Sequence, residues 1–176
     1  MLHKVTAFLT RSDDGTWGVS TVALPGGTPV KYPVEPYATK EIYNNPSLRF
    51  SPDGHQMLLL LNRGRDGEEG WLLKYPPEGS SGVRRIVPAL KTYAGTPLST
   101  WMPDNRHVVM SLQPTPYGSE QLWLVDTQSA ARHALTSSTR SVFDPSVAPG
   151  GDKLVFREIS TLGASRRVIL VGQRRG

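Results

Sequence analysis

A proline-centred turn between two apolar segments occurs three times in this chain of 176 residues and constrains its fold more than any other feature. The three copies contain Pro52-Asp53-Gly54, Pro103-Asp104-Asn105 and Pro149-Gly150-Gly151, with their prolines 51 and 46 residues apart. Proline presets φ for the second position of a β-turn, and Asp, Asn and Gly suit the positions after it, so the flanking strands fold back as a hairpin. A hairpin repeated at this period predicts an array of small antiparallel sheets.

The spacing of strands and turns predicts four such sheets, of which the first and the last are incomplete. They are expected at residues 1–36, 46–88, 97–136 and 143–172 of a single repeat domain, 1–176. The first sheet starts one strand late, with strands expected at 5–10, 17–24 and 28–32. Apolar residues are nowhere sustained at helical spacing, and β-branched and aromatic residues favour strands. We therefore expect an all-β fold.

The repeat resembles a known family. Phe50-Ser51-Pro52-Asp53-Gly54 resembles the W/F-S-P-D-G signature of TolB-like, or WD-like, β-propeller repeats. Trp101-Met102-Pro103-Asp104-Asn105 is similar to it, and Val147-Ala148-Pro149-Gly150-Gly151 looks like a weaker copy. A later R-D-G and aromatic-leucine step of the family is seen as Arg65-Asp66-Gly67 with Trp71-Leu72. The resemblance covers nearly the whole chain and implies a β-propeller-like array of about three and a half four-stranded antiparallel blades.

The resemblance implies a class of function rather than one activity. Proteins with this repeat include the periplasmic TolB component of the Tol envelope system, which is an interaction scaffold. From it we expect a non-catalytic protein-interaction, sensory or scaffold module that belongs to a larger bacterial protein. The alternatives are the C-terminal propeller of a bacterial serine/threonine kinase or regulator, and the gating propeller of a prolyl-oligopeptidase-type peptidase. A TolB-like or receptor-kinase parent implies an extracytoplasmic location.

The motifs of the chain do not indicate catalysis, a cofactor or a metal. The nearest approach to a nucleophile elbow, Gly79-Ser80-Ser81-Gly82, lacks the G-x-S-x-G spacing and lies between two expected strands. The four histidines lack metal-ligand spacing, and the acidic turns lack the D-x-D-x-D-G spacing of a calcium loop. Asp53 and Asp104 are interpreted as caps of their turns. We therefore expect no enzyme activity and no catalytic, cofactor-binding or metal-binding residue.

The charge balance raises the question of a nucleic-acid partner. The chain has 20 Lys and Arg against 15 Asp and Glu, which gives a net charge of +5. The basic residues are spread along the sequence except at Arg84-Arg85, Arg166-Arg167 and Arg174-Arg175, and aromatic residues do not alternate with them as in single-strand binders. We therefore expect no nucleic acid. We see no signal peptide and no apolar run long enough to span a bilayer, so membrane insertion by this chain is not expected.

A protein partner is expected, and the contact residues should lie on turns at a rim of the array. The candidates are Asp66, Glu68, Glu69 and Tyr117, with Arg166 and Arg167 as a basic alternative.

Four tryptophans complete the expected core. Trp17, Trp71 and Trp123 fall at matching places in successive third strands and are interpreted as packing between neighbouring blades, whereas Trp101 precedes a proline turn. Three and a half blades leave strand edges open. The chain is accordingly a piece of a longer protein, a four-bladed ring with two thin blades, or a homodimer whose two copies complete one ring.

Overall fold

The computed structural model describes residues 4–32, 46–62, 67–76, 82–90, 98–113, 115, 118–159 and 171–172. These residues form fourteen strands in four antiparallel sheets, which we name blades A to D. The expectation of an all-β, blade-like array is confirmed. Throughout the described ranges, no helix is long and apolar enough to cross a membrane.

The strands follow one another in chain order within each blade. Blade A contains β1 (Lys4–Arg11), β2 (Trp17–Leu24) and β3 (Val30–Lys31). Blade B contains β4 (Ser47–Phe50), β5 (Gln56–Asn62), β6 (Glu68–Lys74) and β7 (Val83–Leu90). Blade C contains β8 (Ser99–Trp101), β9 (His107–Leu112), β10 (Gln121–Asp126) and β11 (Arg132–Ala134). Blade D contains β12 (Ser141–Val147), β13 (Lys153–Ile159) and β14 (Val171–Gly172).

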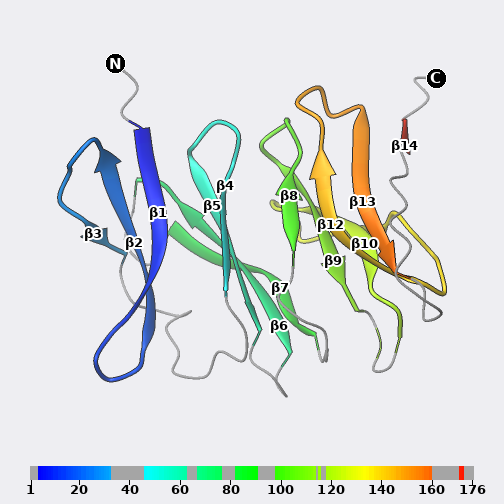
Figure 1. The fold of residues 1–176 in the computed structure, drawn as a ribbon, viewed down its shortest axis with the longest axis horizontal. Helices are drawn as coiled ribbons and strands as arrows, with labels where there is room; N and C mark the ends of the chain where they lie inside the picture. Colours follow the sequence, from blue (N-terminus) through cyan, green and yellow to red (C-terminus); the bar gives the residue numbers. More distant parts are fainter. Residues whose placement is uncertain are drawn as a thin grey trace.

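The four blades stand side by side in a row that follows the chain (Figure 1). Strand β1 contacts β4, β4 contacts β8, and β8 contacts β12, so these four strands lie along one side of the row. Blades A and D lie at its opposite ends. The described chain is thus an open array, and the four-bladed ring considered above is not what it forms.

Among the described residues, blade A has no strand that corresponds to the first strand of blades B and C. The β4–β5, β8–β9 and β12–β13 turns all lie along the upper edge of the row in Figure 1, whereas the β1–β2 turn lies along the lower edge. Strand β1 therefore corresponds to β5 and β9, the second strands of blades B and C. In the described sheet, β1 pairs with β2 alone, and its other edge is unpaired.

The three proline turns share one backbone geometry, which explains their sequence. A hydrogen bond from the fourth turn residue to the first closes each turn, from Gly54 N to Ser51 O (2.9 Å), Asn105 N to Met102 O (3.3 Å) and Gly151 N to Ala148 O (2.8 Å). The same three donors have left-handed φ values of 74°, 58° and 73°. Glycine and asparagine adopt this conformation at low cost, so Asn105 replaces glycine without changing the turn.

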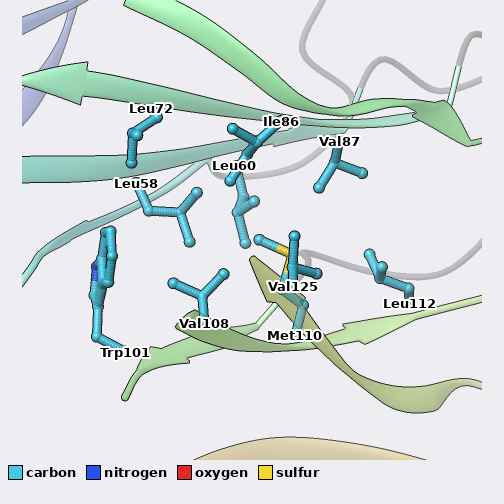
Figure 2. Packing of buried hydrophobic residues seen from close by; sticks show 10 residues of the cluster. All are labelled: Leu58, Leu60, Leu72, Ile86, Val87, Trp101, Val108, Met110, Leu112 and Val125. Atoms are coloured by element: carbon cyan, nitrogen blue, oxygen red, sulfur yellow. The ribbon is translucent and has the colours of Figure 1, made fainter. Parts of the chain in front are cut away.

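In the part of the chain that the structure describes, the core forms three layers, each between two neighbouring blades. The layer between blades B and C is shown in Figure 2, where side chains from β5, β6 and β7 meet those from β8, β9 and β10. Its buried members are Leu58, Leu60, Leu72, Ile86, Val87, Trp101, Val108, Met110, Leu112 and Val125. A second layer joins blades A and B around Val19 and Leu59, and a third joins blades C and D around Leu122 and Phe156. We call these layers seams.

Trp71, Trp101 and Trp123 lie in the seams, whereas Trp17 is not equivalent to Trp71 and Trp123. Trp71 packs in the A–B seam and Trp123 packs against the B–C seam, so each faces the preceding blade. Trp17 shares its strand face with Val19, which points at blade B, so Trp17 faces the following blade. Its expected equivalence with Trp71 is therefore wrong, since an odd offset along a strand reverses the face. Trp101 is buried, as expected, and donates from Nε1 to Arg49 O across the B–C seam (3.1 Å).

Candidate functional site

The three proline turns line up along one edge of the row, which we call the turn rim (residues 51–56, 102–107 and 148–153). The Asn105 side-chain oxygen accepts a hydrogen bond from Asp53 N (2.8 Å). A methyl group built on Gly151 would lie 3.2 Å from Pro103 Cδ, which shows how close the next turn stands. Asp53 and Asp104 cap their own turns, as predicted, by accepting from the backbone N–H of His55 and His107 at 3.0 and 2.9 Å. The first two turns of the rim are therefore hydrogen-bonded to each other, and the third packs closely against the second.

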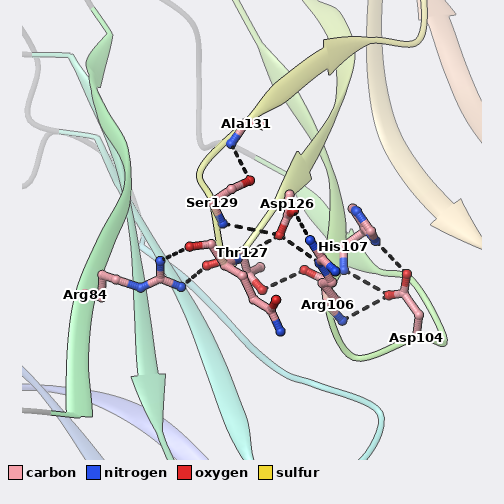
Figure 3. A network of polar contacts seen from close by, with 9 residues as sticks. Arg84, Asp104, Arg106, His107, Asp126, Thr127, Ser129 and Ala131 are labelled. Atoms are coloured by element: carbon pink, nitrogen blue, oxygen red, sulfur yellow. Dashed lines mark hydrogen bonds and ion pairs between the residues drawn. The ribbon is translucent and has the colours of Figure 1, made fainter.

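A polar network extends the rim where blades B and C meet (Figure 3). The Arg106 guanidinium donates to both carboxylate oxygens of Asp126, at 3.1 and 2.6 Å. These bonds, followed by N–H donors of the next turn, hold the pKa of Asp126 well below its usual range. Arg84 donates to the carbonyl oxygens of Thr127 and Gln128. Because β7 of blade B thereby holds the β10–β11 turn of blade C, this network fixes the two blades to each other.

The C–D seam opens at the rim as an apolar pocket of about 110 Å³. Its wall is mostly apolar, and its two charged lining residues, Asp152 and Lys153, belong to the 148–153 turn. The lining residues are Met102, Val109, Leu124, Leu135, Val147, Gly151, Asp152, Lys153 and Leu154. Leu135 is 44% exposed, one of three large apolar side chains that the described residues leave this open. The pocket has room for one aliphatic side chain.

The sequence reading missed this pocket, although a signal for it was present. In blade B the residue before the turn proline is Ser51, whose hydroxyl donates to the Asp53 carboxylate (2.6 Å). In blade C the corresponding residue is Met102, which cannot make that bond and instead lines the pocket. A flexible apolar side chain in place of the repeat's serine marks the position where the rim becomes apolar.

Most of the predicted contact residues fall outside the part of the chain that the structure describes. This holds for Asp66, Tyr117, Arg166 and Arg167. Glu68 is the first residue of β6, and Glu69 is the second. Their expected place on a rim turn is therefore wrong, since both belong to a strand.

Glu69 has a structural role that explains its burial, at 7% exposed. Its carboxylate accepts from Trp71 Nε1 (3.1 Å) and forms an ion pair with Arg85 (3.3 Å), whose guanidinium lies 5.7 Å from the Trp71 ring centre. Glu69 was expected on a turn because residues 65–69 are all charged apart from one glycine. Its ion pair with Arg85 on β7 cannot be predicted from the sequence of β6 alone.

The described residues do not contain a group of three or more His, Asp or Glu side chains that could hold a metal ion. Ser80 and Ser81, the nearest approach to a nucleophile motif, lie outside the described ranges.

Solved structures with similar folds include two TolB proteins and a peptidase. A protein of Agrobacterium tumefaciens assigned as a TolB aligns with a TM-score of 0.61 and 21% identity, over 88% of this chain and 50% of its own. TolB from Acinetobacter baumannii aligns at 0.59 and 16% identity, over 97% and 44%. A puromycin-hydrolyzing peptidase of Mycobacterium tuberculosis aligns at 0.63 and 12% identity, over 97% and 29%.

The chain thus spans about half the length of the TolB structures and less of the peptidase. Searches with protein-family sequence models and against curated protein sequences found no match. At these identities the likeness concerns the fold. The row of hairpin blades, the left-handed fourth turn residue and these neighbours together show that the chain has the fold of a TolB-like β-propeller.

Proposed function

We propose that this chain is a non-catalytic propeller module that binds a protein partner, and that the pocket of the C–D seam receives an apolar side chain of that partner. The observation that carries the proposal is the apolar pocket at the turn rim, with the exposed Leu135 in its wall. Residues that bury an apolar side chain in a preformed pocket contribute most of the energy of many protein interfaces.

The rigidity of the rim supports this choice. Hydrogen bonds join the 102–107 turn to the 51–56 turn and to the β10–β11 turn, so the Met102 side of the pocket is held in place before a partner arrives. A preformed surface spends less free energy on ordering when it binds. Lys153, one of the residues that line the pocket, offers an ammonium group to a carboxylate next to the inserted side chain.

Photo-crosslinking in living cells of the organism whose genome encodes this chain tests the proposal. A benzophenone amino acid placed at Leu135 is expected to give one discrete polypeptide adduct. The matched control is the same group at Leu24, which is equally exposed at 44% but lies in blade A. Met102→Trp should fill the pocket and abolish the adduct. Equal adducts from both positions, or an adduct that survives Met102→Trp, would contradict the proposal.

A second candidate function is the gating propeller of a peptidase. The likeness to the puromycin-hydrolyzing peptidase, at a TM-score of 0.63 over 97% of this chain, favours it. This function requires an α/β-hydrolase domain in the same gene. Sequencing the complete gene separates it from a free-standing interaction module.

A further inference from the structure

One acidic side chain is buried in the C–D seam at the end away from the turn rim. Glu120 directly precedes β10, and its alternation with Leu122 and Leu124, which pack in the C–D seam, directs its side chain toward blade D. The residue is 9% exposed, and within the described chain its buried Oε2 has no hydrogen-bond partner. A charged carboxylate in such a place is costly, whereas its protonated form costs far less.

The backbone of Glu120 is part of the contact that closes the seam. Glu120 O accepts from Val142 N (2.9 Å), and Glu120 N donates to Ser141 Oγ (3.3 Å). Ser111 Oγ donates to Val142 O (2.8 Å). The carboxyl group therefore lies where β9, β10 and β12 are joined, and any change in its charge acts on the seam directly.

The neighbouring charged side chains do not compensate a negative charge on the Glu120 carboxylate. Asp144 and Arg157 of blade D act on it with opposite signs and are paired with each other (3.0 Å). Burial is the largest influence and raises the pKa of Glu120 to about 7, while Arg157 lowers it and Asp144 raises it.

The other charged groups on the packed elements are engaged elsewhere or lie further along the strands. Glu158 of β13 pairs with Arg140 (3.4 Å) and accepts from Ser138 Oγ (3.2 Å). Lys153, the first residue of β13, lines the pocket at the turn rim, away from Glu120. On β9, His107 lies opposite Asp126 at the other end of β10. On β11, Arg132 and His133 lie opposite Val125 and Leu124.

We propose that a proton on Glu120 holds blade D against blade C, and that loss of this proton weakens the seam. The direction follows from the two states of the carboxyl group. In the closed seam its pKa is about 7, and in an open, hydrated seam it returns to the ordinary value of 4.5. Below 4.5 the group is neutral in both states, and above 7 it is charged in both. Opening therefore becomes easier as pH rises between these values, by at most about tenfold per pH unit.

Hydrogen exchange of the full chain between pH 5 and 8 tests this proposal. After correction for intrinsic exchange, the protection of β12 and β13 amides should fall as pH rises, relative to that of β5 and β6. Glu120→Gln should keep this protection high at pH 8. Glu158→Gln is the matched control, because it removes a paired carboxylate from the same seam, and it should keep the wild-type pH response.

Two variants that remove a charged neighbour of Glu120 should shift the midpoint of the pH response in opposite directions. Asp144→Asn removes the negative neighbour and frees Arg157, so the midpoint of the response should move to lower pH. Arg157→Gln should move it to higher pH. An unchanged pH response in Glu120→Gln, or a shift in the same direction for both charge variants, would overturn the proposal. A ¹³C titration of the Glu120 carboxyl in the wild-type chain is independent of any variant, and a midpoint below pH 5 would also overturn it.

Discussion

The side-chain oxygen of Asn105 accepts a hydrogen bond of 2.8 Å from the backbone N–H of Asp53, a residue of the preceding blade. Asn105 does this from a left-handed backbone conformation, at φ 58°. One residue thus completes its own turn and ties that turn to the neighbouring one. The departure from the repeat's glycine at this position is therefore an added contact between blades B and C.

This double role predicts different effects for two substitutions of Asn105. Asn105→Gly keeps the backbone conformation and removes the hydrogen bond, so the free energy of unfolding should fall by about 1 kcal/mol. Asn105→Ala loses the bond and also places a β-carbon in the left-handed region, which should cost about 1 kcal/mol more. Urea denaturation of the three proteins measures the difference. If the alanine variant is as stable as the glycine variant, the conformational part of the explanation fails.

Glu69 should behave as a structural residue rather than a contact residue. Glu69→Ala leaves the Trp71 indole N–H and the Arg85 guanidinium without this acceptor inside the protein. The free energy of unfolding should fall by about 1–3 kcal/mol. Denaturant midpoints measured for the wild type and the variant test this. A stable variant with normal folding would return Glu69 to the set of surface contact candidates.

The tryptophans should differ in their contribution to stability. Trp71 is 7% exposed in the A–B seam, so Trp71→Ala should cost about 3–5 kcal/mol. Trp17 is half-buried, with the Arg11 guanidinium 5.9 Å from its ring centre, and Trp17→Ala should cost less. Thermal and denaturant unfolding of both variants provides the comparison. Equal losses would show that the two residues are equivalent after all.

Asp126 should contribute to stability in a pH-dependent way. Its pKa is lowered in the folded chain by the hydrogen bonds from Arg106 and the following turn, so its contribution is present above the ordinary value of 3.8 and is lost as pH falls below it. Asp126→Asn should lower stability at pH 7 and flatten the decline of stability in acid. Arg106→Gln should have the same effect, and the double variant should lose less than the sum of the two. Additive losses in the free energy of unfolding would argue against the ion pair between Arg106 and Asp126.

The arrangement of strands could be predicted from the sequence because it depends on local patterns. Proline turns and the apolar segments beside them define the hairpins. The hairpins and the number of strands are as expected. The facing of Trp17 could not be predicted, because it depends on an offset within β2 that only pairing with β1 reveals. The same limit applies to Glu69 and Glu120, whose burial is produced by strands far along the chain.

The pocket could be predicted from the sequence only in part. Met102 departs from the serine of the repeat, and that departure is visible in the sequence. The remaining walls come from β9, β10, the segment after β11 and blade D, and they meet only when blade D packs against blade C. A single blade does not form the cavity on its own.

The seams have a consequence for how the chain loses its structure. Each blade packs on its neighbours in the row, so the array has the energetics of a one-dimensional lattice, in which stability is a sum of units and of couplings between adjacent units. Within the row, blades B and C each have two couplings, whereas blades A and D have one. Unfolding should therefore begin at the ends and move inward. The B–C pair, joined by ten buried side chains and by the Arg84 and Asn105 bonds, should be the last unit to melt.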